Sequence, residues 1–304
     1  MKKILILLTL CLLLLYGCGK EPEPDTRNFS PKAETVEISL PAASREYKLL
    51  WLSDLHMVLP GKEGDPAQQD AIDARTAYST SGGIPAAEQW ELWIPYLTDA
   101  KADALLFGGD MLDLCSTEGV DTLSEGFAKL ESPYIYLRAD HDLLPTYLKD
   151  YDVQGAWDKQ SSLCKNEGVM SMAFDDFTLI AWNNSTSELT DSGLERILQL
   201  VDEGKPLVLL THVPIAPLED ESLAEASRAA FDGRVLLWGY GDCEYVPGPN
   251  TRQLLDLLYA EDSPFIAVFA GHLHFSWDGY INKNVPEHVF GPAFAGDHGI
   301  ITLK

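Results

Sequence analysis

The sequence is poor in cysteine and in basic residues, and both shortages narrow the possible functions. Its five cysteines include no CxxC pair, which argues against a cysteine-based metal knot and against a disulfide framework. We expect Cys115, Cys164 and Cys243 to be buried free thiols, with one disulfide as the alternative in an exported protein. The 22 lysines and arginines are outnumbered by 47 aspartates and glutamates, so the formal net charge is −25. Such an acidic protein repels polyanions, and general nucleic-acid binding is not expected.

Long apolar runs are also missing, apart from Ile4–Tyr16 near the N-terminus. This run follows Lys2 and Lys3 and is too short to span a bilayer comfortably. The residues Leu15–Cys18 (LYGC) then resemble the lipobox of a bacterial lipoprotein, in which Cys18 is acylated and becomes the mature N-terminus. We therefore predict a signal peptide over residues 1–17 and an extracytoplasmic protein that is lipid-anchored to the bacterial cell membrane. An ordinary secretory signal or membrane anchor is the alternative.

The remaining chain reads as a flexible tether followed by one α/β domain. Residues 18–34 are polar and contain prolines, which is typical of a tether, and residues 35–304 form the predicted domain. With 46% hydrophobic and 23% charged residues, the chain can bury a substantial core. We expect an edge strand, three amphipathic helices, a long helix that Pro95 kinks or ends early, and a β-hairpin. The edge strand is expected at 35–40 and the β-hairpin at 170–182. The three amphipathic helices are expected at 123–130, 191–204 and 252–259, and the long helix at 86–100.

Five apolar strand-like segments each end in aspartate or histidine. These segments and their endings are 47–52 with Asp54 and His56, 103–107 with Asp110, 133–137 with Asp140 and His141, 206–210 with His212, and 264–268 with His272 and His274. A single H-x-H at a strand end is more often structural than functional. A buried sheet, however, has no need for a carboxylate or an imidazole at every strand exit. Because α/β sheets collect their sites at the carboxyl ends of strands, and both residue types bind divalent cations, the pattern predicts a metal site.

The order of these segments resembles the calcineurin-like metallophosphoesterase superfamily, whose pattern is D-x-H, G-D-x-x-D, G-N-H-D/E, H and G-H-x-H. The matching residues are Asp54-Leu55-His56, Gly109-Asp110-Met111-Leu112-Asp113, Ala139-Asp140-His141-Asp142, His212 and Gly271-His272-Leu273-His274. The resemblance covers the chain from about Tyr47 onward. It implies a four-layer α/β/β/α sandwich, with two mixed sheets flanked by helices, and a hydrolase that acts on phosphoric esters.

The resemblance also implies two divalent metal ions, such as manganese, iron or zinc, and a role for each matching residue. The first ion would be held by Asp54, His56 and His274, the second by Asp140, His212 and His272, and Asp110 would bridge both. A hydroxide shared by the ions would attack phosphorus in line. His141 would protonate or stabilise the leaving oxygen, and Asp142 would hold its ring. Asp113 would act either indirectly or structurally, with a direct role as the alternative.

Asp140 stands where the family pattern has asparagine. A carboxylate is still a good oxygen ligand, so metal binding should survive. The centre would carry one unit less of positive charge, which predicts weaker attraction for an anionic substrate and a less acidic bridging water.

The predicted partner is a small phosphorylated substrate, either a monoester or a diester. The segments Met57–Pro85 and Trp238–Asn250 are expected to shape its pocket, where Trp238 and Tyr240 either stack on the substrate or pack internally. Arg138 is either a substrate clamp or, as we expect, part of a surface salt bridge, and no basic cluster marks a phosphate-rich ligand. Two other classes stay open: a non-catalytic metal- or ligand-binding lipoprotein on the same scaffold, and the solute-binding lipoprotein of a transporter.

Overall fold

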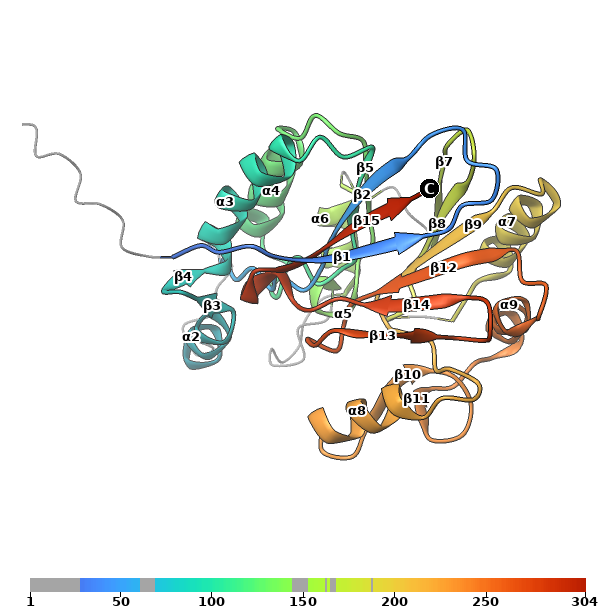
Figure 1. The fold of residues 1–304 in the computed structure, drawn as a ribbon. Helices are drawn as coiled ribbons and strands as arrows, with labels where there is room; N and C mark the ends of the chain where they lie inside the picture. Colours follow the sequence, from blue (N-terminus) through green and yellow to red (C-terminus); the bar gives the residue numbers. More distant parts are fainter. Residues whose placement is uncertain (1–27, 61–68, 144–152, 162, 165–167, 187) are drawn as a thin grey trace, which may run out of the picture.

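The computed structural model describes residues 28–60, 69–143, 153–161, 163–164, 168–186 and 188–304 (Figure 1). The predicted signal peptide, Cys18 and most of the predicted tether lie outside the described residues. Within the described part of the chain, no helix is long and apolar enough to cross a membrane.

Two mixed β-sheets form the centre of the domain. The first has the strand order β1 (Lys32–Ile38), β15 (Asp297–Leu303), β2 (Tyr47–Leu52), β5 (Ala104–Phe107) and β6 (Tyr134–Tyr136). The second has the order β13 (Trp277–Tyr280), β14 (Pro286–Val289), β12 (Phe265–Ala270), β9 (Leu207–Thr211), β8 (Thr178–Trp182) and β7 (Val169–Ala173). In the second sheet the four inner strands are parallel, and the two edge strands β13 and β7 run antiparallel to them.

The alternation of side chains along β2 creates the layers of the fold. Leu49 and Trp51 lie in the core between the two sheets, whereas Leu50 and Leu52 lie in a second core beneath helices. The helices on this outer face are α3 (Ala86–Asp99) and α4 (Thr117–Phe127). The outer face of the second sheet is covered by α7 (Asp191–Asp202) and α9 (Pro249–Tyr259). The sheets flanked by helices confirm the predicted α/β/β/α arrangement.

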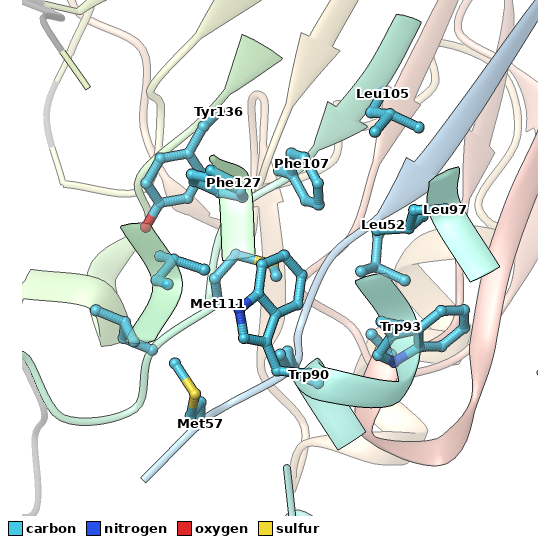
Figure 2. Close-up of a cluster of buried hydrophobic side chains, with 14 of the residues drawn as sticks. Leu52, Met57, Trp90, Trp93, Leu97, Leu105, Phe107, Met111, Phe127 and Tyr136 are labelled. Atoms are coloured by element: carbon cyan, nitrogen blue, oxygen red, sulfur yellow. The ribbon is translucent and has the colours of Figure 1, made fainter. Parts of the chain in front are cut away.

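The core beneath α3 and α4 is rich in aromatic side chains (Figure 2). The rings of Trp90 and Phe127 pack edge to face, with their centroids 5.6 Å apart, and Trp90 also contacts Phe107 of the sheet. The aromatic side chains Trp90 and Trp93 of α3 are therefore part of the core. Helix α3 continues through Pro95 to Asp99, so the expectation of an early end is wrong. The buried side chains on both sides of Pro95 hold this helix in place, which outweighs the one backbone hydrogen bond that a proline cannot donate.

The shorter elements lie in the loops and at one end of the second sheet. They are α2 (Gln69–Tyr78), β3 (Thr80–Ser81), β4 (Ile84–Pro85), α5 (Asp140–Leu143), α6 (Val153–Gln160), α8 (Ser222–Ala230), β10 (Val235–Trp238), β11 (Cys243–Tyr245) and the 3₁₀ helix η2 (Ala293–Ala295). Helix α8 packs against β10 and, with the pair β10–β11, forms a small layer of its own (Figure 1).

Several sequence predictions differ from the structure at element ends. Strand β1 begins at Lys32, inside the segment expected as tether, because its parallel pairing with β15 already starts there. Helix α4 begins at Thr117, earlier than predicted, because the Ser116 hydroxyl accepts a hydrogen bond from Gly119 N–H and caps the helix. Arg138 is 2% exposed, so the expected surface salt bridge is wrong. In the described part of the chain, Cys115, Cys164 and Cys243 are buried thiols that form no disulfide, as predicted.

Candidate metal centre

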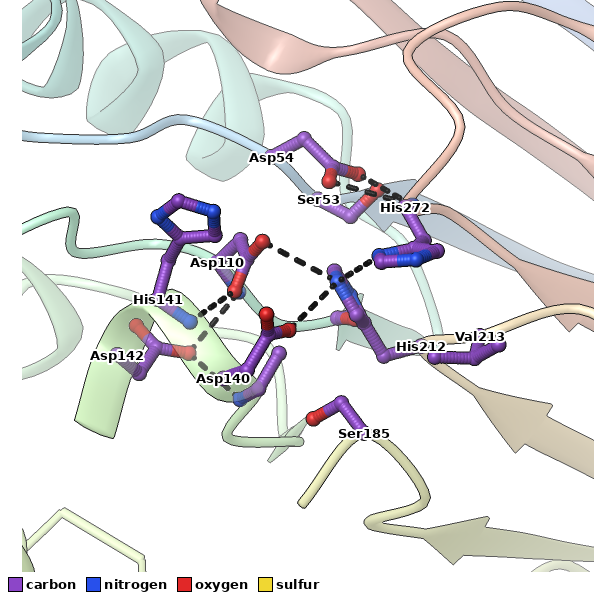
Figure 3. A network of polar contacts seen from close by, with 12 residues as sticks. Ser53, Asp54, Asp110, Asp140, His141, Asp142, Ser185, His212, Val213 and His272 are labelled. Atoms are coloured by element: carbon purple, nitrogen blue, oxygen red, sulfur yellow. Dashed lines mark hydrogen bonds and ion pairs between the residues drawn. The ribbon is translucent and has the colours of Figure 1, made fainter. Parts of the chain in front are cut away.

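The carboxyl ends of β2, β5, β9 and β12 meet at one edge of the sandwich, and the polar side chains that follow them converge there (Figure 3). All seven residues predicted as metal ligands are brought together in two groups. One group consists of Asp110, Asp140, His212 and His272, and the other of Asp54, His56 and His274. Within each group, one possible ligand atom from each residue lies within 4.8 Å of the others.

Unusual backbone conformations aim these side chains. Five of the seven have a positive φ: 57° at Asp54, 50° at His56, 51° at Asp110, 72° at His272 and 52° at His274. This left-handed region is unfavourable for residues with a side chain, and strain of this kind gathers at functional sites. The strand-end pattern in the sequence therefore marks not only the residues but also the sharp turns that carry them.

Small residues let these turns approach one another closely. A Cβ atom added to Gly271 would lie 2.4 Å from Asp54 Oδ2. A Cβ added to Gly109, whose φ is 99°, would lie 2.9 Å from His212 Nδ1. The close approach of these turns therefore requires glycine at both positions.

His212 is oriented with one ring nitrogen facing the first group. Its Nδ1 donates to the main-chain carbonyl of Gly108 at 2.8 Å, which directs Nε2 toward Asp110 and His272. This Nε2 lies 3.2 Å from Asp110 Oδ2 and 3.2 Å from His272 Nδ1. Asp140 Oδ1, 3.9 Å away from the same atom, is buried and has no hydrogen-bond partner among the described residues.

In the group Asp54, His56 and His274, ring nitrogens and a carboxylate also face one another. His56 Nδ1 lies 2.9 Å from Asp113 Oδ1, so Nε2 faces the group, 3.0 Å from His274 Nε2. Asp54 Oδ1 is 3.4 Å from that nitrogen of His274. Asp110 Oδ2 also lies 3.7 Å from His56 Nε2 and therefore reaches both groups, as a bridging ligand must.

The charges of the site favour a cation. Burial, the largest influence on His212, would lower its pKa, but Asp110 and the other carboxylates raise it to about 10. Burial and the neighbouring His212 lower the pKa of His272 to about 3, which keeps this imidazole neutral and able to bind a metal. Although burial opposes it, the hydrogen bond with His274 and the nearby histidines lower the pKa of Asp54 to about 2. The convergence of acceptor atoms, with a buried carboxylate oxygen lacking a donor, therefore fits divalent metal ions.

The position of Asp142 differs from the expectation that it holds the His141 ring. Its carboxylate accepts main-chain N–H groups of Asp110 at 2.9 Å, Leu112 at 2.7 Å and Ala139 at 2.8 Å. Asp113 lies against the ring instead, with Oδ1 2.7 Å from His141 Nδ1. Because α5 begins at Asp140, the side chain of Asp142 points back to the loop after β5 rather than to its neighbour in sequence.

Two residues near the site lie in the segment Met57–Pro85, which is called the insertion below, and were not found from the sequence. Arg75 of α2 forms a two-pronged ion pair with Asp113, from Nε at 2.6 Å and from Nη2 at 2.8 Å. The hydroxyl of Tyr78, also on α2, lies 2.8 Å from His274 Nδ1. The segment 57–85 carries no motif, and no signal in it pointed to these contacts.

Trp238 and Tyr240, the two aromatic residues expected either to stack on the substrate or to pack internally, differ in burial. Trp238 is 5% exposed and its Nε1 donates to Asn184 O, so it is a packing residue, whereas Tyr240 is exposed. Tyr245, which was not predicted, lies beside the centre, with its ring centroid 6.0 Å from that of His272. The two unassigned histidines, His288 and His298, lie outside both ligand groups.

Comparisons with known proteins agree with this geometry. The family model described as calcineurin-like phosphoesterase matches residues 47–276. A dimetal phosphatase from Danio rerio superposes with a TM-score of 0.51 at 9% identity, over 82% of this chain and 88% of that one. A purple acid phosphatase from yellow lupin (Lupinus luteus) seeds gives a TM-score of 0.50 at 11% identity, over 84% of this chain and 45% of the lupin chain. At these identities the likeness is one of fold. A comparison with curated proteins finds no match.

Proposed function

Because the chain belongs to the calcineurin-like phosphoesterase family, we propose that it hydrolyses a small phosphorylated substrate, a phosphomonoester or phosphodiester, at the centre described above. The observation that carries the proposal is the pair of adjoining ligand groups with Asp110 reaching both. When bound, two divalent ions there supply an acidified water and neutralise the charge of a phosphoryl group. Manganese, iron and zinc all suit this set of imidazoles and carboxylates.

Different residues would hold the two ions. Asp54, His56 and His274 hold one ion, and Asp140, His212 and His272 hold the other. The backbone turns with positive φ at Asp54, His56, His272 and His274 fix these four side chains before any ion arrives, which reduces the reorganisation that binding requires.

His141 is the proposed proton donor to the leaving oxygen. Its side chain is 22% exposed, so it can reach a substrate, and its main-chain N–H donates to Asp110 Oδ1 at 3.1 Å. Asp113 Oδ1 lies 2.7 Å from Nδ1 as an ion-pair partner, so Nε2 is the atom that would face the leaving group. The nearby carboxylates, with Asp110 first among them, outweigh the effect of burial and raise the pKa of His141 to about 9, which keeps the ring protonated at neutral pH.

The test is hydrolysis of p-nitrophenyl phosphate and of bis(p-nitrophenyl) phosphate by the manganese-loaded protein, with Asp110→Ala as the matched variant. We expect turnover of one or both esters that the variant loses, and the preferred ester separates monoesterase from diesterase. Two bound ions without turnover of either ester would favour a non-catalytic metal-binding protein, for which Asp140 in place of asparagine is the supporting observation. Failure to bind any divalent ion would overturn the proposal.

We further propose that the protein is exported and lipid-anchored through Cys18. The support is the basic and apolar N-terminal segment followed by the LYGC sequence. Labelling with a radioactive fatty acid in a bacterial host should mark the wild-type protein and not Cys18→Ser. Equal labelling of both would contradict the anchor.

A further inference from the structure

The two histidines of the group Asp54, His56 and His274 are supported from behind by one helix. Tyr78 on α2 contacts His274 Nδ1 directly, at 2.8 Å. Arg75, three residues earlier on the same helix, holds Asp113, whose Oδ1 lies 2.9 Å from His56 Nδ1. Residues three apart share a helix face, so a single face of α2 reaches the outer nitrogens of both rings.

The two side chains also brace each other. The Arg75 guanidinium lies over the Tyr78 ring, with Cζ 4.7 Å from the ring centroid. On the other side, the Tyr78 ring packs 5.2 Å from Phe294, which in turn contacts the His274 ring at 5.3 Å. The buried side chain of Ile72 anchors the helix one turn before Arg75. These contacts hold Arg75 and Tyr78 in position, although Tyr78 remains 47% exposed.

Among the described residues, His212 of the other ligand group is oriented without a contact to α2. His212 is oriented by the main-chain carbonyl of Gly108, at the end of β5, and this contact involves no residue of the insertion. The outer partners of histidine ligands set the ring orientation and the basicity of the ligating nitrogen. The two groups are thus supported by different parts of the chain.

We propose that Arg75 and Tyr78 are positioning residues that set the affinity of the metal site formed by Asp54, His56 and His274, without setting that of the other site. Tyr78 acts on His274, and Arg75 acts on His56 through Asp113. This inference rests on the metal centre of the proposed function. It adds that the affinities for the two ions differ in their dependence on α2. The ion held by Asp54, His56 and His274 is the one that a change in α2 releases.

The experiment is a titration of the metal-free, full-length protein in detergent with manganese, followed by calorimetry and by electron paramagnetic resonance. The variants are Tyr78→Phe, which removes only the hydroxyl, and Arg75→Gln, which removes the charge. The matched controls are Tyr280→Phe and Arg45→Gln. Arg45 is a useful match because it also pairs with an aspartate, Asp103, and lies over a tyrosine ring, away from the centre.

We expect one of the two dissociation constants to rise by about 10-fold or more in each test variant, with the other unchanged. At a manganese concentration that fills both wild-type sites, the spectrum of the coupled ion pair should give way to that of an isolated ion. Arg75→Lys, which keeps the charge but not the fork, should fall between wild type and Arg75→Gln. The controls should titrate like wild type, and equal urea midpoints would show that the variants are folded.

The possible failures are distinguishable. If the wild type binds two ions and turns over substrate while both constants stay unchanged in both variants, the role of α2 is wrong and the proposed function stands. The same holds if both constants rise equally, because α2 would then support the whole centre. If the wild-type protein binds no manganese, both this inference and the proposed function are wrong.

Discussion

The carboxylate of Asp113 lies between two imidazoles, with its Oδ1 2.7 Å from His141 Nδ1 and 2.9 Å from His56 Nδ1. The carboxylate is fully buried, and Arg75 binds both of its oxygens. Although burial opposes it, these partners, with Arg75 the strongest, hold the pKa of Asp113 far below its usual range. One ionised side chain thus links a proposed metal ligand to the proposed proton donor.

Substitution of Asp113 should therefore affect catalysis, whereas substitution of Asp142 should affect stability. Asp113→Asn removes the charge behind both rings, so we expect kcat/KM to fall by roughly 10- to 100-fold. Asp142→Asn weakens the anchoring of three main-chain N–H groups, so we expect it to lower the free energy of unfolding by about 1–3 kcal/mol. Steady-state kinetics and urea unfolding of both variants check this. A larger loss of kcat/KM in a fully folded Asp142→Asn would reverse the assignment.

The seven ligands could be predicted from sequence because each directly follows a strongly apolar strand. The parallel strands β2 and β5 and the strands β9 and β12 then bring their ends together without further information. The support behind the ligands could not be predicted. Asp142 is next to His141 in sequence, whereas Asp113 follows a different strand, and the start of α5 at Asp140 turns Asp142 away from the ring that Asp113 faces.

The fold was predictable to a similar extent. Strands buried on both faces, such as β9, are continuous apolar runs, and helix α7 has a regular apolar stripe. The strands β13, β14 and β15 after the last motif were not predicted. In β13 the sequence is WDGY, whose alternation is too short to separate from a loop, and its place depends on pairing with β14.

Asp140→Asn tests the effect of the extra carboxylate in the centre. Asp140 lies 3.9 Å from His212, among the other buried ligands, and the variant keeps an oxygen ligand while removing one negative charge. We expect the acidic limb of the pH–rate profile to move to lower pH and KM for a dianionic monoester to fall. The profile of kcat/KM against pH with p-nitrophenyl phosphate checks this. An unmoved acidic limb, with both ions still bound, would contradict the proposed effect of the Asp140 charge.

Glu287 on β14 should make stability depend on pH without involving the centre. It is fully buried, and burial raises its pKa to about 8 from an ordinary value of 4.5. Between these values the unfolded chain has lost a proton that the folded protein keeps. The free energy of unfolding should therefore fall as pH rises through this window, by up to about 1.4 kcal/mol per pH unit.

Glu287→Gln checks that expectation, because glutamine cannot ionise yet keeps the oxygen that accepts Ile215 N–H at 2.8 Å. Urea midpoints measured from pH 5 to pH 8 in the presence of a chelator should decline less in the variant than in wild type. The exposed Glu37→Gln serves as the control and should leave the decline as it is. An equally steep decline in Glu287→Gln would show that another group is responsible.

Gly271→Ala should weaken metal binding while leaving the sheets intact. The added methyl group would lie 2.4 Å from Asp54 Oδ2 and 2.5 Å from Ser53 Oγ, so the carboxylate must turn away from His274. The methyl group points into the site rather than into the cores between the layers, so the loss should appear in affinity more than in folding. Calorimetric titration with manganese should show at least one site weakened by 10-fold or more. Gly204→Ala, where an added Cβ meets nothing within 4 Å but φ is 73°, controls for a general effect of losing a glycine. If Gly271→Ala bound two ions as tightly as wild type, Asp54 would not be a ligand in the position that the structure gives it.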